Sequence, residues 1–331
     1  MKKSYISILL LLMVMILGIS AVSAADIDDT SDLALTQDDS TILEVEDTSE
    51  EVQAASDTEV IADSGEGNNF TSLKTLINEA GSSLTLTKDY TRVAGDSDIE
   101  INKDFTIDGQ DTYTIDANNL GGIFKVNTGY TLTLTGVTLI NGNSDNGGAV
   151  YVENGATLNA EDCKFNQNTA VYRGGAIYSE GGVNIVGSVF DSNNITFRTK
   201  NDDNGGAAVY NYNGVLSIVD SNITNNLKDI VIRNGNAGDL LVGVVVTSGE
   251  TVIKGSYFAN NAGSWGGAIS SLGYLNTESY TLTVMDSKFE GNNATFGGAI
   301  FVESSNLEVY NCTFENDSFK NFVDFQNRFR F

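Results

Sequence analysis

Apolar and polar positions follow two different patterns along the chain, and each pattern predicts a different element. Within residues 70–81 the apolar positions recur three and four residues apart, which is the spacing of one face of a helix: Leu73, Leu76, Ile77 and Ala80. Thr71 or Ser72 can cap the start of this helix, and Gly81 fits its end. From residue 82 onward, short apolar runs alternate with polar positions and are separated by Asp-, Asn- and Gly-rich turns, which predicts a succession of short strands.

Two motifs recur through the strand-rich part, from Gly121 to about Asp317. The first is Gly-Gly-Ala followed by a small or aliphatic residue, at 147–150, 174–177, 205–208, 266–269 and 297–300. The second is an aromatic or aliphatic residue followed three positions later by Asn, at Phe165/Asn168, Phe190/Asn193, Ile223/Asn226, Phe258/Asn261 and Phe289/Asn292. Phe314 continues the second series with Asp317 in place of the Asn, and one unit, within 227–255, lacks the glycines. Repeats of this length are typical of solenoids.

Alignment on the second motif exposes further columns of equivalent residues. Five positions earlier stand Ala160, Ile185, Ile218, Ile253, Val284 and Val309; two positions earlier stand Cys163, Ser188, Ser221, Ser256, Ser287 and Cys312; three positions earlier stand Asp162, Gly187, Asp220, Gly255, Asp286 and Asn311. One such unit cannot bury its own apolar face, so units stack at the strand spacing of about 4.8 Å. We therefore predict a single-stranded parallel β-helix with apolar columns inside, a turn at the Gly/Asp column, paired Asn side chains and a helix that caps the first coil.

The same alignment predicts the state of the cysteines. Cys163 and Cys312 share a column but lie five coils apart, about 24 Å at the strand spacing. A disulfide requires Cα atoms within roughly 7 Å, so we expect two unpaired, largely buried thiols.

The motifs resemble those of two families. The Gly-Gly-Ala-Ile and Phe-x-x-Asn elements, at 174–177 with Phe190/Asn193 and at 297–300 with Phe289/Asn292, look like the repeats of chlamydial polymorphic outer-membrane proteins. The segments Phe70–Leu73, Leu84–Leu86, Asp89–Tyr90, Ile101–Lys103 and Thr106–Gly109 resemble the start of adhesin-like proteins of methanogenic archaea. The resemblance covers about 70–320. It implies an exported, right-handed, pectate-lyase-like β-helix with an adhesive role.

The pattern of the first 66 residues predicts a signal for export followed by a spacer. Residues 1–24 have a basic start, an apolar run and small residues suited to cleavage near Ala24/Ala25, as in a signal peptide. Residues 25–66 are rich in Asp and Glu and contain neither Lys, Arg nor aromatic residues, which predicts a disordered acidic spacer. We divide the remainder into the capping helix and first coils (67–120), the repeats (121–318) and an aromatic tail (319–331). We expect no transmembrane span in the mature chain and an extracellular or cell-surface location.

The composition argues against several classes of partner and of catalytic site. The net charge of −26 argues against a nucleic-acid partner, because phosphates require clustered Lys and Arg. The chain has no His, which removes the commonest general base and every His-containing triad. Calcium is a side hypothesis for an acidic extracellular protein, without named ligands; no other cofactor is expected.

An enzyme is the alternative function, because parallel β-helices also host polysaccharide lyases and hydrolases. The best local candidate is Asp202 and Asp203, with Arg198 nearby, since hydrolysis uses paired carboxylates. A solvated loop explains these residues more simply, and the regularly spaced Asp column is what turns of a repeat produce. We therefore expect no catalysis.

Binding residues are sought on the surface. The sequence has six Asn-x-Ser/Thr acceptors, including Asn311 and Asn316, and four of the six are the candidate glycosylation sites: Asn69, Asn194, Asn222 and Asn293. Tyr151, Tyr178, Tyr210 and Phe301 follow the glycine pairs and form either a binding stripe, if they point outward, or part of the core. The expected function is an adhesin-like binding or structural module for glycans or proteins of a host or neighbouring cell; the oligomeric state does not follow from the sequence.

Overall fold

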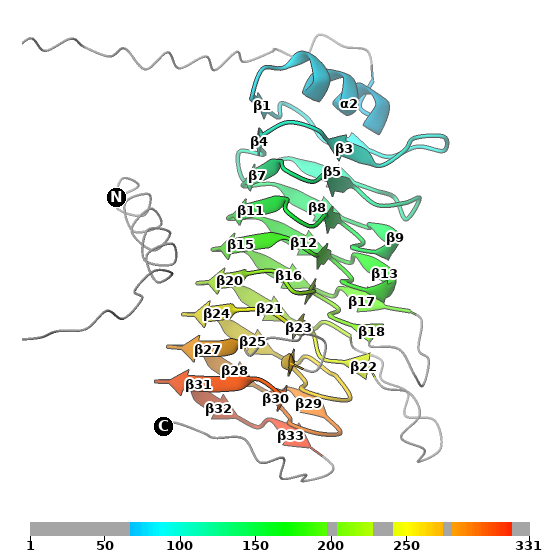
Figure 1. Cartoon of the computed structure of the whole chain (residues 1–331). Helices are drawn as coiled ribbons and strands as arrows, with labels where there is room; N and C mark the ends of the chain where they lie inside the picture. The colour runs from blue at the N-terminus through cyan, green and yellow to red at the C-terminus, as the bar shows by residue number, and fades with distance from the viewer. Residues whose placement is uncertain (1–66, 197–203, 228–240, 274–279, 320–331) are drawn as a thin grey trace, which may run out of the picture. The chain divides into compact units, whose positions relative to one another are not determined.

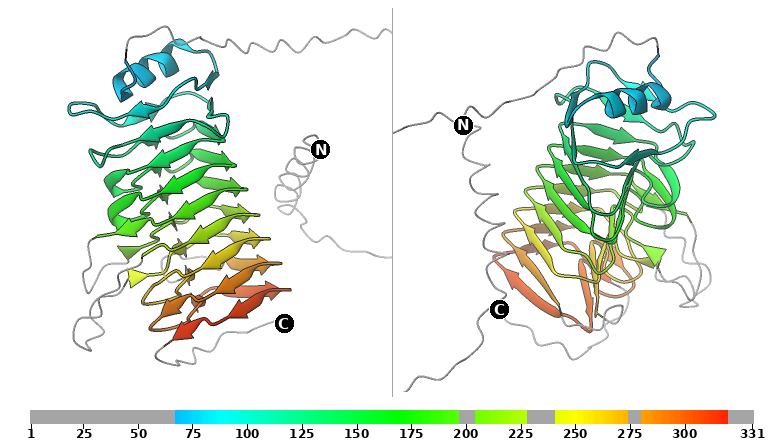
Figure 2. Two further views of the ribbon diagram at one scale, coloured as in Figure 1. Left: turned by 180° about the vertical axis from the view of Figure 1, so that it is seen from behind. Right: turned by 45° about the horizontal axis from the view of Figure 1, so that its top comes forward.

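The structure is a computed structural model that describes residues 67–196, 204–227, 241–273 and 280–319. All of these residues fall within one compact unit, 55–331. They form a right-handed parallel β-helix, in which equivalent strands of successive coils lie one above another (Figures 1 and 2). The predicted all-β solenoid with a short helix at its N-terminal end is confirmed.

Three long parallel sheets form the walls. Sheet A contains β1 (Ser83–Thr85), β4 (Phe105–Asp108), β7 (Thr131–Thr135), β11 (Thr157–Glu161), β15 (Gly182–Val186), β20 (Leu216–Val219), β24 (Thr251–Lys254), β27 (Thr281–Met285) and β31 (Asn306–Tyr310). Sheet B contains β2 (Tyr90–Thr91), β5 (Thr114–Asp116), β8 (Thr138–Ile140), β12 (Lys164–Asn166), β16 (Val189–Asp191), β21 (Asn222–Thr224), β25 (Tyr257–Ala259), β28 (Lys288–Glu290) and β32 (Thr313–Glu315). Sheet C contains β3 (Ile99–Ile101), β6 (Phe124–Val126), β10 (Val150–Val152), β14 (Ile177–Ser179), β19 (Val209–Asn211), β23 (Val245–Thr247), β26 (Ile269–Leu272) and β30 (Ile300–Glu303).

Two smaller sheets lie between sheets B and C along the chain. Sheet D contains β9 (Asn143–Asn146), β13 (Thr169–Arg173), β17 (Asn194–Ile195), β18 (Asn204–Gly205) and β22 (Leu241–Val242). Sheet E contains β29 (Asn293–Ala294) and β33 (Ser318–Phe319). Each coil thus passes through sheets A and B, then the small sheets where present, then sheet C, before it returns to sheet A one level further on.

The strand registers confirm the apolar columns. On sheet B the paired residues are Phe165, Phe190, Ile223, Phe258, Phe289 and Phe314, and on sheet A they are Ala160, Ile185, Ile218, Ile253, Val284 and Val309. The rings of Phe165 and Phe190 stack with centroids 4.5 Å apart. Burial of one face of every strand against the coils above and below supplies the hydrophobic stabilisation that one coil alone lacks.

The Asn column forms a buried hydrogen-bond ladder. Its members, Asn168, Asn193, Asn226, Asn261 and Asn292, are at most 1% exposed. In each of the first four, the backbone N–H and the side-chain Nδ2 both donate to Oδ1 of the Asn one coil on, at 2.9–3.2 Å. The predicted pairing of amides is confirmed, and it satisfies backbone donors at a corner where no strand partner is present.

The Ser/Cys and Gly/Asp columns complete the corner between sheets A and B. The backbone N–H of Cys163 donates to Ser188 Oγ at 3.1 Å, and the bond recurs at the next three levels, from Ser188, Ser221 and Ser256. The preceding column has positive φ throughout, from 49° to 61°, in Asp162, Gly187, Asp220, Gly255, Asp286 and Asn311. Gly, Asn and Asp tolerate this conformation best, which explains the composition of the column.

The cap is helix α2 (Phe70–Glu79), whose buried side chains include Leu73, Leu76 and Ile77, as predicted. Our prediction of the N-cap residue is wrong. Asn69 holds this position rather than Thr71 or Ser72, and Asn69 Oδ1 accepts a hydrogen bond from the backbone N–H of Ser72 at 2.9 Å. Asn is among the most favourable N-cap residues, because its side-chain oxygen can accept a backbone N–H of the first turn.

The glycine motif needs one correction and gains one confirmation. Tyr178 pairs with Tyr210, so the equivalent of Gly174 is Gly206, one residue later than the aligned Gly205. Gly174 and Gly206 both have φ of 65°, and a Cβ on Gly174 would collide with the carbonyl oxygen of Ile177. The coil predicted to have lost its Gly-Gly-Ala element exists: β23 lies between β19 and β26 in sheet C.

Candidate functional site: the outer face of sheet C and the cap pocket

The outer face of sheet C carries a column whose chemistry changes from coil to coil. Strand pairing places in this column Glu100, Lys125, Tyr151, Tyr178, Tyr210, Val246, Ser270 and Phe301. Successive strand residues point to opposite faces, and neighbours such as Val150 and Ile177 belong to the interior core. The column therefore faces away from the interior. It begins with two charged residues, continues with three tyrosines and ends with Val246, Ser270 and Phe301.

The four aromatic residues of the predicted stripe all lie in this column. Tyr178, Tyr210 and Phe301 are only 5%, 1% and 8% exposed, and Tyr151 is half-buried. The rings of Tyr151 and Tyr178 are 5.1 Å apart, and those of Tyr178 and Tyr210 are 5.8 Å apart. The sequence offered an outward stripe or an inward core. The structure shows a third arrangement, a hydrophobic cluster outside the β-helix interior yet buried, in which Tyr151 alone of the four keeps substantial exposure.

One carboxylate, that of Glu180, holds two of the phenols of this column. Tyr151 and Tyr178 both donate from their hydroxyl groups to Glu180 Oε1, at 3.2 and 2.9 Å. Burial, followed by the nearby charge of Glu180, raises the pKa of Tyr151 to about 12, and burial with the Glu180 hydrogen bond also raises the pKa of Tyr178. Both phenols therefore stay protonated at neutral pH and act as donors.

One coil nearer the N-terminus, a lysine and a glutamate form an ion pair. Lys125 Nζ lies 2.7 Å from Glu153 Oε1, and Glu153 Oε2 accepts from the backbone N–H and the hydroxyl of Thr128 at 3.0 and 3.1 Å. The hydrogen bond from Lys125 is the main cause that lowers the pKa of Glu153. Both charges are thus kept in place at neutral pH, although an exposed pair of this kind adds little stability.

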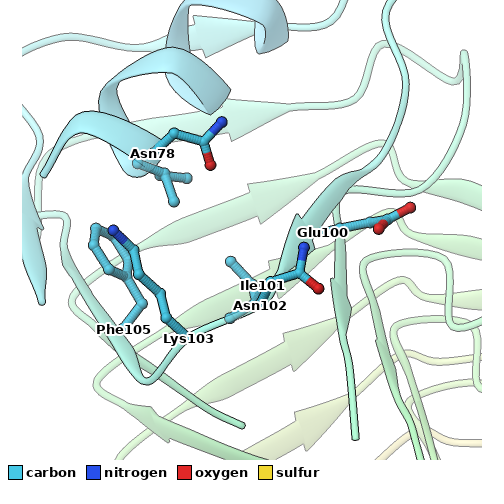
Figure 3. Close-up of a pocket in the computed structure, with 7 residues that line it drawn as sticks. Asn78, Glu100, Ile101, Asn102, Lys103 and Phe105 are labelled. Carbon is cyan, nitrogen blue, oxygen red and sulfur yellow. The ribbon is translucent and has the colours of Figure 1, made fainter.

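A pocket lies where the column meets the cap (Figure 3). Its cavity of about 230 Å³ is lined by Ile77 and Asn78 of α2 and, from the first coils, by Glu100, Ile101, Asn102, Lys103 and Phe105. The Glu100 carboxylate on β3 points away from Asn78, Lys103 and Phe105 (Figure 3). The Lys103 ammonium lies 4.8 Å from the centre of the Phe105 ring. Ile77, Ile101 and Phe105 are at most 3% exposed, so the accessible surface of the pocket comes mainly from its polar residues.

The pocket was not predicted from the sequence. Its residues come from α2 and from positions 100–105, more than 20 residues later, which span the end of β3, the following turn and the start of β4. Neither Glu100 nor Asn102 belongs to a repeated motif. The one available signal was the polar character of Glu100 and Asn102 beside the apolar Ile99 and Ile101, which marks an exposed strand face without saying what lies opposite it.

The other predicted sites are placed as follows. Asp202, Asp203 and Arg198 lie outside the described residues, so the enzyme alternative stays a prediction at that locus. Among the glycosylation candidates, Asn222 on β21 and Asn293 on β29 are exposed, Asn194 is half-buried, and Asn69 caps α2. Cys163 and Cys312 are unpaired, as predicted, but only Cys163 is buried; Cys312 is half-buried because it lies in the last described coil.

The described part of the chain lacks two features, a cluster of metal ligands and a membrane-spanning helix. No group of three or more Cys, Asp or Glu residues there is placed to hold a metal ion. None of the helices in the same ranges has both the length and the apolar character needed to cross a bilayer.

Comparison with known proteins bears on this architecture. The family described as Chlamydia polymorphic membrane protein (Chlamydia_PMP) repeat matches residues 162–180, which contain the Phe165/Asn168 pair and the 174–177 motif. A probable autotransporter, YfaL of Escherichia coli (strain K12), is 32% identical over 195 residues. This match covers 53% of our chain and 15% of the relative's length. The predicted resemblance to chlamydial repeats is confirmed over one repeat, whereas the archaeal resemblance stays a prediction.

Proposed function

We propose that this protein is an exported, surface-exposed β-helix that acts as an adhesin-like binding module. The observation that carries the proposal is the contrast between the two faces of sheet C. The inward columns repeat the same residue types at every level, whereas the outward column changes from Glu100 and Lys125 to Tyr151 and then to buried aromatics. From Tyr178 on the column is buried, so its accessible part is Glu100, Lys125 and Tyr151. A rigid interior that holds non-repeating accessible residues is the arrangement expected of a recognition surface.

The similarities support the same proposal at a coarser level. One is to a repeat of polymorphic membrane proteins and the other to a probable autotransporter, which favours a protein at or beyond the cell surface. The predicted signal peptide at 1–24 agrees with export. Glycans or proteins of a neighbouring or host cell are the proposed partners.

The polysaccharide-active enzyme is the second candidate, but the outer face of sheet C gives it little support. Glu153 is held by Lys125, and Glu180 accepts hydrogen bonds from two protonated phenols, so both carboxylates are occupied as acceptors. General acid catalysis requires a protonated carboxyl group at working pH, whereas the pKa of Glu153 is lowered.

The test pairs binding with turnover. The mature chain is applied to a glycan array and to cultured cells, and the same preparation is incubated with soluble polysaccharides while reducing ends and unsaturated products are measured. We expect saturable adhesion without product release. Product release from any polysaccharide would establish the enzyme, and absence of adhesion to every cell type and ligand would refute the binding module.

A further inference from the structure

We propose that the segment 320–331 folds back over the open C-terminal end of the β-helix and closes it, as α2 closes the N-terminal end. The surface that it covers belongs to the last described coil, at β31 and β32 (Figure 1). Residues 320–331 lie outside the described residues, and their position is inferred from the coil that they follow and from their sequence. The inference goes beyond the proposed binding function and does not depend on it.

The last described coil leaves interior side chains and strand edges without a neighbour. Phe314 is 47% exposed, whereas Phe289, one coil earlier in the same column, is fully buried. Val309 and Cys312 of the last coil are half-buried. Among the described strands, β31 pairs only with β27 and β32 only with β28, so one edge of each is open. Natural proteins cover an open strand edge that lies beside exposed apolar side chains.

The sequence of 320–331 does not continue the repeat. Equivalent residues of the last two coils are 25 positions apart, as in the pair Asn293 and Ser318. At this offset Phe322 stands where the preceding coil has Gly297. Gly297 has a φ of 61°, and a Cβ there would collide with the carbonyl oxygen of Ile300. A phenylalanine does not fit this corner without strain, so we expect the segment to leave the path of the coils there.

The segment has the length and the apolar content to cover the end. It follows Phe319, the last residue of β33, and Phe314 lies five residues before that point, at most about 18 Å away along an extended chain. The twelve residues of the segment can themselves span about 40 Å. Aromatic rings in the segment can continue the stack in which Phe289 and Phe314 lie 4.8 Å apart. The segment contains five large apolar side chains: Phe322, Val323, Phe325, Phe329 and Phe331.

The charges favour this segment over a second copy of the chain as the cover. Residues 300–319 contain four acidic residues and neither Lys nor Arg: Glu303, Glu308, Glu315 and Asp317. Lys288 of the preceding coil is shared between Glu290 and Glu315, at 2.9 Å from each, so it does not offset this excess. Two copies joined end to end would bring the acidic residues of both together. The segment carries the opposite charge, with three basic residues against the single acid Asp324: Lys320, Arg328 and Arg330.

The experiment compares the mature full-length chain with three variants. The first ends at Phe319. The second keeps the full length and replaces the four aromatic residues of the segment: Phe322→Ser, Phe325→Ser, Phe329→Ser and Phe331→Ser. The third, Asn321→Ser with Asn327→Ser, is the matched control, because it changes polar residues of the same segment. Mass spectrometry of peptides measures the rate at which a thiol reagent modifies Cys312, with Cys163 of the same molecule as the internal reference. Amide hydrogen exchange of 306–315 is followed in parallel.

The first two variants are expected to react at Cys312 about tenfold faster or more than the parent protein, because a covered thiol reacts only when its cover opens. Exchange at 306–315 should become faster as well, whereas Cys163, buried in an inner coil, keeps its rate. The matched control should behave like the parent protein. In the parent protein Cys312 still reacts before Cys163, since a twelve-residue segment opens at lower cost than an inner coil.

Three results would overturn the inference. The first is an unchanged rate at Cys312 and unchanged exchange at 306–315 in both the shortened and the Ser-substituted variants. The second is an equal increase at Cys312 and Cys163, which would mean general loss of the fold instead of loss of a local cover. The third is a parent protein that light scattering shows to be a dimer and that stays a dimer when it ends at Phe319, since a second copy would then cover the end.

Discussion

At each end of the described β-helix one coil lacks a neighbouring coil to cover its apolar side chains. The two ends differ in how far the described residues cover them. At the N-terminal end α2 covers the first coil, and Phe70 and Leu73 of the helix are 1% and 0% exposed. At the C-terminal end Phe314 is 47% exposed, although Phe165 in the same column is fully buried. Because an inner coil has neighbours on both sides and an end coil has only one, the cap supplies what the missing neighbour would.

The Asn ladder shows the same difference. Its inner members use Nδ2 to donate to a backbone carbonyl oxygen one coil back, as Asn292 does to Phe258 O at 3.0 Å. At the C-terminal end Asp317 takes the place of the Asn; its Oδ1 accepts from Asn292, and its buried Oδ2 lacks a partner among the described residues. An ionised Asp has no side-chain donor, so the last described rung lacks the bond to a backbone carbonyl oxygen that the inner rungs make.

The largest expected effect comes from the cap. Phe70→Ala removes a buried ring and is expected to cost about 3–5 kcal/mol, whereas Phe314→Ala loses mainly one stacked contact, with Phe289 at 4.8 Å, and is expected to cost about 1 kcal/mol. Urea unfolding monitored by circular dichroism gives the two midpoints. Equal shifts for both variants would show that the ends contribute alike and would contradict the comparison.

A rung in the middle of the ladder is expected to matter next. Asn226→Ala leaves the backbone N–H and Nδ2 of Asn193 without their acceptor, which is expected to cost about 1–3 kcal/mol. Asn222→Ala, four residues earlier and exposed, is the control and should stay within about 0.5 kcal/mol of the parent protein. If both variants unfold at the same urea concentration, the ladder is not a stabilising element.

Asp317→Asn is expected to complete the last rung and to stabilise the protein at neutral pH by about 1 kcal/mol, the value of one hydrogen bond. Burial raises the pKa of Asp317 above its ordinary value of 3.8. Folding therefore disfavours the ionised form: the penalty is absent below pH 3.8 and reaches its full size above the raised pKa.

The gain from Asp317→Asn should accordingly be small at low pH and grow as the pH rises through that window. Unfolding midpoints at a series of pH values measure it, with Asp286→Asn as the control in an exposed turn of sheet A. A gain that is independent of pH would mean that the charge of Asp317 is not the cause.

The cysteines provide the mildest test, since labelling need not unfold the protein. Burial raises the pKa of the Cys163 thiol to about 12, and Cys163 is fully buried, whereas Cys312 is half-buried in the last described coil. A thiol-reactive reagent should modify Cys312 first, as shown by mass spectrometry of peptides. Faster modification of Cys163 would indicate that the middle of the stack opens more readily than its C-terminal end.

Much of the fold could be predicted because its determinants repeat. The Phe/Ile, Ser and Asn columns each appear several times at fixed offsets, so a single error cannot displace the register. The prediction was wrong by one residue where a motif allows two alignments. Either glycine of the 205–206 pair fits the sequence pattern, and the strand pairing together with the φ of 65° at Gly206 shows that Gly206 is the equivalent of Gly174.

The site was less predictable, for a physical reason. Alternation along β14 and β19 places Tyr178 and Tyr210 on one face, but it does not reveal that this outward face is itself covered. The cap pocket depends on how α2, which carries Asn78, lies next to the segment after β3, which carries Asn102, and these two segments share no sequence pattern. Residues that occur once carry no periodic signal, and recognition surfaces are made of such residues.

The axial stacking of the coils determines how the molecule responds to tension. Its two described ends lie at opposite ends of the stack, so a pull between them acts across the strands and loads the hydrogen bonds one level at a time (Figure 1). Such loading peels a sheet at low force, whereas a pull along the strands would have to break a whole row at once. A tethered molecule of this design would lengthen coil by coil under tension, and each coil that detaches would dissipate part of the applied work.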